Sequence, residues 1–200
     1  SYEKLKAQKS LIEIKERMYG KNNEDIINKL LSYNISSLKQ LEILMEKNGF
    51  KLVNNKNDEN ALDILKNGVR EKTINGNQLI FSNPKNDNRA KQIKAILNKY
   101  KEVYSNKVFK VEDRRYLEKI LPEEKQKENW KPKIEFESEL QKKLRDVFGI
   151  DVIFHHKDEL HPFGYTLIDH KTGTIYKGSE ILKMNNLFEF TSEVMDKKLF

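Results

Sequence analysis

The stretch Phe148–Ile181 reads FGIDVIFHHKDELHPFGYTLIDHKTGTIYKGSEI and contains the clearest succession of strand patterns in the chain. β-Branched, aromatic and other apolar residues gather in three short runs, at 150–154, 163–169 and 174–177, which predicts three strands. Gly149 ends the helical pattern that precedes the first run, and Gly173 ends the loop between the last two. We therefore expect a helix that begins at Phe136 or Ser138, then a strand, and then a β-hairpin.

The first hundred residues carry mainly helical patterns. Apolar residues recur at helical spacing in four segments, which lie at about 2–18, 23–31, 37–45 and 88–100. Between the last two segments we expect a strand at Phe50–Val53, a short helix at Ala61–Lys66, and a hairpin that turns at Asn75-Gly76. The fold class is therefore α+β: a mostly helical N-terminal module with a small hairpin, then a small helix–strand–β-hairpin module.

The boundary between these modules is predicted from a charged, irregular segment at 105–133, in which Lys131-Pro132 marks a linker. The predicted modules are 1–104 and 134–200. The segments 37–53 and 138–152 also share one pattern, a helix, a glycine and an immediately following strand. Both a duplication and ordinary α+β packing produce such a pattern.

Composition limits the classes of protein that this chain can belong to. Cysteine is absent, which excludes disulfides and thiolate metal sites and is compatible with a reducing cytoplasm. No apolar run approaches the roughly 18 residues of a membrane span, and no signal-peptide pattern opens the chain. We expect a cytoplasmic protein with no membrane partner.

Net charge is +7, and most of this excess lies in the middle of the chain. Within the helical segment 88–100 and just beyond it, Lys91, Lys94 and Lys101 follow one stripe, away from the apolar face. Such a stripe can follow a phosphate backbone, and interleaved aromatic rings can stack on bases. A solvated lysine face gives the same pattern. The residues that we expect to bind nucleic acid are Arg89, Lys91, Lys94, Lys101, Tyr104, Arg114, Arg115, Lys177 and Ser179.

Three of the four histidines lie close together, at His155, His156 and His161. With Asp169 they suggest a metal-dependent nuclease built on the segment from His155 to His170, but adjacent histidines on a strand point to opposite faces. Solvent-facing loop histidines are the other interpretation. Turn chemistry likewise explains Asp169 and His170, and no nucleophile is specified beside them. We expect no metal ligands, no cofactor and no catalytic residue.

The quoted stretch also carries a family resemblance. The segments GYTLIDHK at 164–171 and TIYKGSE at 174–180 resemble a region beyond the catalytic domain in relaxases, the mobilization proteins, of Bacteroidetes-type mobile elements. The resemblance covers Ser138–Leu182 and implies a role in conjugative DNA processing. The nicking site of relaxases uses a tyrosine with a metal-binding histidine cluster, typically with a His-x-His element. No such element stands here, because His155 and His156 are adjacent, so no catalytic residue is carried over and the resemblance implies a non-catalytic region.

The sequence thus predicts a non-catalytic, relaxase-like accessory region that binds the nucleic-acid backbone, DNA rather than RNA, through the central basic helix. A further partner is expected among the proteins of a mobilization complex. The alternatives are a protein–protein interaction module without nucleic-acid binding and the metal-dependent nuclease.

Overall fold

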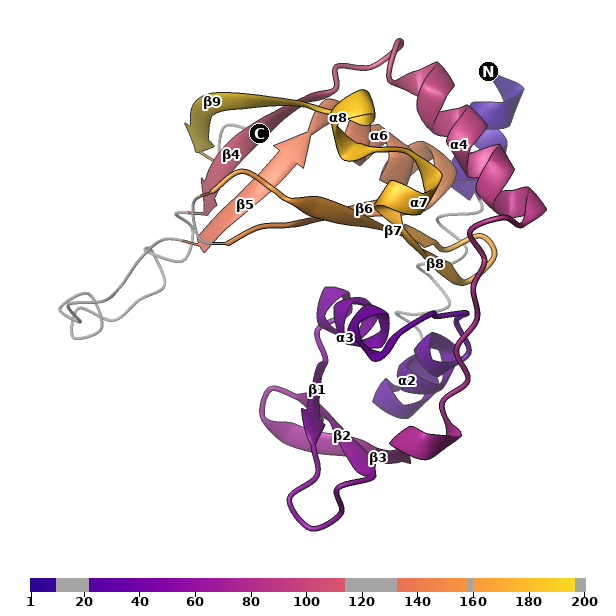
Figure 1. Ribbon diagram of the computed structural model, residues 1–200, viewed down its shortest axis with the longest axis vertical. Helices are drawn as coiled ribbons and strands as arrows, with labels where there is room; N and C mark the ends of the chain where they lie inside the picture. The colour runs from indigo at the N-terminus through magenta and orange to yellow at the C-terminus, as the bar shows by residue number, and fades with distance from the viewer. Residues whose placement is uncertain (10–21, 114–132, 158–159, 197–200) are drawn as a thin grey trace, which may run out of the picture.

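The computed structural model describes residues 1–9, 22–113, 133–157 and 160–196, and it has an α+β fold (Figure 1). Residues 2–9 are helical. The other helices are α2 (Asn23–Leu31), α3 (Leu38–Lys47), α4 (Asn88–Tyr100), α6 (Glu139–Phe148) and the short α7 (Gly178–Ile181) and α8 (Met184–Leu187). The strands form three three-stranded sheets, with the orders β1-β2-β3, β5-β4-β9 and β6-β7-β8.

The first sheet contains β1 (Lys51–Asn54), β2 (Ala61–Lys66) and β3 (Val69–Asn75), and the sheet most important for the site contains β6 (Ile150–His155), β7 (Gly164–Asp169) and β8 (Thr174–Lys177). All pairs in both sheets are antiparallel. The three strands predicted from the quoted stretch are confirmed. The short helices α7 and α8 follow β8.

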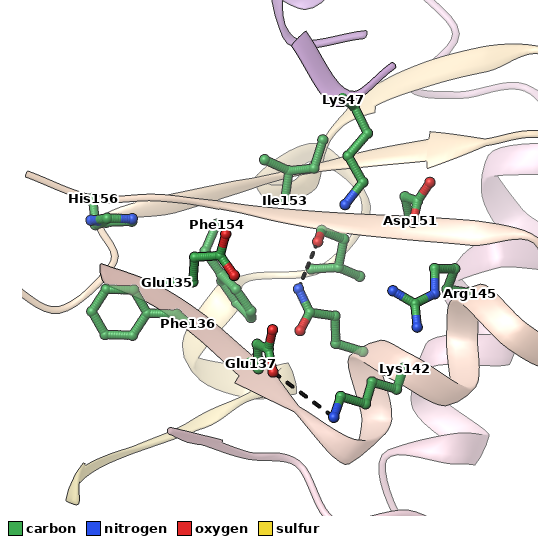
Figure 2. Close-up of a pocket in the computed structure, with 12 residues that line it drawn as sticks. Lys47, Glu135, Phe136, Glu137, Lys142, Arg145, Asp151, Ile153, Phe154 and His156 are labelled. Carbon is green, nitrogen blue, oxygen red and sulfur yellow. Dashed lines mark hydrogen bonds and ion pairs between the residues drawn. The ribbon is translucent and has the colours of Figure 1, made fainter. Parts of the chain in front are cut away.

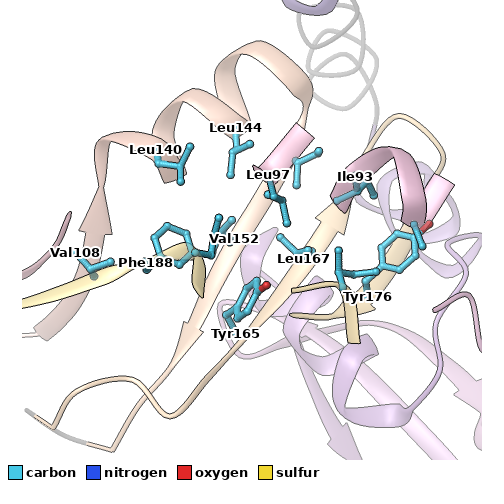
Figure 3. Close-up of a cluster of buried hydrophobic side chains, with 14 of the residues drawn as sticks. Ile93, Leu97, Val108, Leu140, Leu144, Val152, Tyr165, Leu167, Tyr176 and Phe188 are labelled. Atoms are coloured by element: carbon cyan, nitrogen blue, oxygen red, sulfur yellow. The ribbon is translucent and has the colours of Figure 1, made fainter. Parts of the chain in front are cut away.

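The sheet β6-β7-β8 is buried on both faces, between two helical layers (Figure 1). Neighbouring residues of β7 point to opposite sides: Leu167 packs with α4 and α6, whereas Ile168 packs with α2, α3 and the first sheet. Figure 3 shows the first of these cores, in which Ile93, Leu97 and Leu144 surround Leu167. The layers therefore follow the order sheet, helices, sheet, helices.

Local signals set the start and end of the main helices. Ser138 caps α6 in a reciprocal capping box with Gln141, and Gly149 ends the helix with φ +65°. Of the two predicted starts, Ser138 is confirmed, whereas Phe136 lies in the preceding strand. Ser37 and Asp87 cap α3 and α4 by accepting hydrogen bonds from backbone N–H groups.

Two predictions in the first sheet are wrong. Residues 61–66 form strand β2 instead of a helix, because Leu62 and Ile64 fill the core while both edges of the strand pair with neighbours. The hairpin turns at Asn67-Gly68, which have φ values of +51° and +79°, rather than at Asn75-Gly76. Asn75 instead caps a 3-10 helix at Gly76–Gln78.

The predicted linker at 105–133 also differs from the structure. Its first part contains β4 (Lys107–Asp113), which pairs antiparallel with β5 (Lys133–Ser138) and parallel with β9 (Glu189–Asp196). Val108 and Val111 of this strand are buried, which explains why a segment with many charged residues is ordered. The rest of the linker, at 114–132, lies outside the described residues.

Helix α4, which the sequence assigned to the first module, packs its apolar face into the core of the second. Ala90, Ile93 and Leu97 are buried there with Leu140 and Tyr176. Each core therefore draws on both predicted modules.

The two segments with a shared pattern have the same topology. In each, a helix that begins after a capping serine leads through a positive-φ glycine into a three-stranded antiparallel sheet: α3-β1-β2-β3 and α6-β6-β7-β8. A glycine after the third strand packs against the second residue of the middle strand, Gly76 on Leu62 and Gly178 on Tyr165. The first unit has a β-bulge between Ile64 and Leu65, and no such irregularity is present in the pairing of β6, β7 and β8.

Candidate nucleic-acid interface

A groove lies where the two units meet, and we name it the junction groove. It occupies about 1110 Å³ between the first turn of α3, the β6–β7 end of the buried sheet, and the residues around α7 and α8. Lys39, Lys177 and Lys183 line it, together with the single carboxylate Glu180. Within the described ranges Lys177 and Lys183 form no ion pair, and Lys39 has only an exposed partner, Glu42, at 3.4 Å between Nζ and Oε2. The charge of the lining is therefore positive.

The apolar wall of the groove includes Phe163, whose surface is 69% exposed. The ring of His155 lies beside it, with 6.3 Å between the ring centroids, and Nε2 of His155 lies 2.7 Å from Oγ1 of Thr166. Burial lowers the pKa of His155, and the positive charges of Lys39 and His156 lower it further. The groove thus combines cations with an exposed aromatic ring.

The predicted residues on α4 have different surroundings. Lys91 and Lys94 are exposed on its outer side. Lys101, just after the helix, donates from Nζ to the backbone oxygen of Asn186 at 3.1 Å, and Asn186 also lines the junction groove. This contact places the end of the α4 stripe next to the groove.

Arg89 is engaged within the protein. Its Nε and one terminal nitrogen donate to the two carboxylate oxygens of Asp169 at 2.8 and 3.1 Å, and the side chain of Asp169 is fully buried. Thr172 also donates to this carboxylate, at 2.6 Å. The guanidinium therefore holds α4 against the β7–β8 hairpin, which leaves little of it for a phosphate.

Tyr104 is also packed within the protein. Its ring stacks on Tyr100, at 5.9 Å between centroids, and Nζ of Lys143 lies 5.6 Å from its centroid. The predicted residues Arg114 and Arg115 lie outside the described residues. The structure thus brings Lys177, Ser179 and the end of α4 together at one groove, but places Arg89 and Tyr104 elsewhere.

Sequence reasoning missed Lys39, Lys183 and Phe163. Lys39 lies far from the basic segment in the chain, and Lys183 stands alone between two short helices. Only the fold brings them to Lys177. The exposed Phe163 lies next to Pro162 at the start of a strand, and nothing in that pattern separates a core aromatic residue from a surface one.

The three neighbouring histidines do not converge. His155 faces Thr166, His156 packs on the ring of Phe136 at 4.8 Å between centroids, and His161 stacks on Phe190 at 6.0 Å. In the part of the chain that the structure describes, no group of three or more histidine or carboxylate side chains could hold a metal ion. The predicted opposite orientation of His155 and His156 explains why these residues do not form a metal site.

His170 belongs to a hydrogen-bonded chain between the units. Its Nδ1 lies 2.8 Å from the hydroxyl of Tyr33, and its Nε2 lies 2.6 Å from Oδ2 of Asp151. Burial raises the pKa of Asp151, but the hydrogen bond from His170 and the attraction of His170, Lys47 and Arg145 outweigh this and lower the pKa below its ordinary value. Burial, with the charges of Asp151 and Asp169, raises the pKa of Tyr33 to about 12. These contacts attach the α2–α3 connection to the buried sheet.

A second, smaller pocket of about 210 Å³ lies beside β5, β6 and α6 (Figure 2). Its cations are Lys47, Lys142 and Arg145, and its carboxylates are Glu135, Glu137 and Asp151. Lys142 lies 3.8 Å from Glu137, as Figure 2 shows. Because the two signs balance, this pocket suits a polyanion less well than the junction groove.

Comparison with known proteins adds no relative: no family model, no curated protein and no solved structure matches the chain. Among the described helices, none combines the length and apolar character that a membrane crossing needs.

Proposed function

We propose that this chain is a non-catalytic module that binds nucleic acid, and that the phosphate backbone lies in the junction groove. The observation that carries the proposal is the convergence of Lys39, Lys177 and Lys183 on one groove with a single carboxylate in its lining. Each lysine that neutralises a phosphate releases bound counterions, which favours binding at low salt.

The surface beyond the groove supports the same ligand. Lys101 is tied to the rim through Asn186, and Lys91 and Lys94 continue along α4 on its exposed side. The positive surface is therefore longer than one pocket, which suits an extended polyanion. Because the segment Ser138–Leu182 resembles a region of mobilization relaxases, we take DNA as the ligand and DNA mobilization as the context.

The test is a comparison of two double variants that remove the same charge. Lys177→Ala with Lys183→Ala changes the groove, whereas Lys51→Ala with Lys56→Ala changes exposed lysines at the first sheet. DNA affinity is measured at about 50 and 200 mM salt. We expect the groove variant to bind more weakly and its salt slope to fall by about 2, one for each lost phosphate contact.

We expect the control variant to bind nearly as the unchanged chain does. If both variants lost DNA affinity equally, the affinity would depend on net charge alone, which would contradict binding in the junction groove. No binding of DNA or RNA at low salt, combined with capture of a protein partner, would favour the protein-interaction module instead.

A further inference from the structure

Two side chains in the lining of the junction groove, His155 and His156, can change charge near neutral pH, and of these His155 has a ring nitrogen bonded to another groove residue, Thr166. Resting on the proposed function, we infer that His155 is a proton-linked phosphate contact, so that the module takes up a proton when it binds a phosphodiester chain. Binding of the phosphodiester chain would then strengthen as the pH falls, because the imidazole ring of His155 in the groove becomes protonated.

The argument begins with the two ring nitrogens. Nε2 is engaged with Thr166, whereas Nδ1 has no hydrogen-bond partner among the described residues. No described side chain keeps a buried nitrogen or oxygen without a partner, so Nδ1 is at least partly exposed to solvent, and the residue itself lines the groove. A ligand in the groove can therefore reach this nitrogen.

Hydrogen bonding and charge together favour the protonated ring in the complex. A neutral ring can face a phosphate oxygen only as the tautomer in which Nδ1–H donates and Nε2 accepts from the hydroxyl of Thr166, and it then brings no charge to the contact. The protonated ring makes the same contact as a charge-assisted hydrogen bond, which is stronger. In the protonated ring, Nε2–H donates to Thr166 and Nδ1–H donates to the phosphate. The proton comes from the solvent, and no bond of the ligand breaks.

The charges around His155 explain why the free ring resists protonation. The groove also contains four other groups that can carry positive charge, opposed by Glu180: Lys39 of α3, His156 just after β6, Lys177 of β8 and Lys183 beyond α7. Burial and the positive charges of Lys39 and His156 lower the pKa of His155 in the free protein. Phosphates placed among these lysines would cancel their effect, and the bound ring would accept a proton at a higher pH.

The experiment is calorimetric titration of the whole chain with a short DNA oligonucleotide, near pH 6.5, in buffers with different ionisation enthalpies. The dependence of the heat on the buffer measures the protons taken up. We expect an uptake of up to one proton per complex and an affinity that rises between about pH 7.5 and 5.5, tenfold for each unit by which binding raises the pKa. Titration of the His155 ring by NMR, with and without DNA, reports the same shift without a variant.

His155→Gln can still bond to Thr166 but cannot titrate, so it should bind DNA at about pH 7.5 and lose the uptake. His161→Gln, outside the groove lining, should keep it. Binding of DNA by the unchanged chain without proton uptake, or uptake that survives in His155→Gln, overturns this inference and leaves the proposed function standing. Absence of DNA binding at any pH overturns both.

Discussion

Arg89 and Asp169 form a largely buried ion pair. Asp169 is fully buried, and its carboxylate accepts from both sides of the guanidinium fork and from the hydroxyl of Thr172. A buried carboxylate is stable only while such donors surround it. The residue that we expected to contact DNA therefore stabilises the fold.

Arg89→Ala would leave the buried charge of Asp169 without its main partner, and we expect a loss of about 3–5 kcal/mol in the free energy of unfolding. Arg145→Ala is the matched control, because the Arg145–Asp146 pair is about half exposed, and it should change stability by about 1 kcal/mol or less. Denaturant unfolding measures both. If both variants lost only a little stability, the hydroxyl of Thr172 and solvent would be enough to stabilise the buried carboxylate of Asp169.

At the residue scale, the sequence could predict caps but not partners. Ser138 and Gly149 act through neighbours a few positions away, so their roles follow from local spacing. Arg89 meets Asp169 across 80 positions in the chain, and no local pattern contains that information. For the same reason, the basic segment of the sequence could not show that Lys39 would join Lys177 and Lys183 in the groove.

Among the secondary-structure elements, α7 packs closely on a sheet. It begins at Gly178, where a Cβ atom would lie only 2.5 Å from the ring of Tyr165 in β7. The hydroxyl of the same tyrosine donates to the backbone oxygen of Leu182 beyond the helix. Glycine is therefore required by the packing of the helix on the strand.

Gly178→Ala should push α7 away from β7 and destabilise the protein by about 1–3 kcal/mol, the usual cost of overpacking. Gly164→Ala, at the start of the same strand, is the control, since a Cβ there meets nothing within 4 Å. Thermal unfolding compares the two variants. Because Ser179 lies in this helix and Lys183 follows it, Gly178→Ala should also weaken DNA binding, and an unchanged affinity would show that the groove tolerates a shift of α7.

Helices and strands with a strong local sequence pattern were predicted correctly. Strands that depend on pairing with distant strands were not. The three strands after Gly149 are rich in β-branched and aromatic residues, so their extents match the prediction. Strand β2 has the short apolar pattern of either a helix or a strand, and only its pairing with β1 and β3 decides between them. Strand β4 was not predicted because its partner residues lie 20 or more positions away along the chain.

On the scale of the whole molecule, one sheet connects two hydrophobic cores. Leu167 and Ile168 are adjacent in β7 and fully buried on opposite sides. The hydrogen bonds of Tyr33 with His170 and of Arg89 with Asp169 attach further elements to the same hairpin. We therefore expect the described units to unfold together.

Leu44→Ala tests this expectation, because Leu44 is fully buried in the core of α2 and α3. It should cost about 2–5 kcal/mol. Hydrogen exchange should then quicken by the same factor in α6, on the far side of the shared sheet, as in α3. Faster exchange confined to α3 and the first sheet would contradict a single cooperative unit.

The parallel pairing of β4 with β9 has a consequence for biosynthesis. Strand β4 lies in the middle of the chain, and its partner at 189–196 is added by the ribosome some eighty residues later. Strands β1, β2 and β3 pair only with one another and can do so as soon as they emerge, whereas β4 must wait with one edge unpaired. A nascent chain stalled before residue 189 would present that bare edge to other polypeptides, so chaperone capture and aggregation should be greatest in that interval.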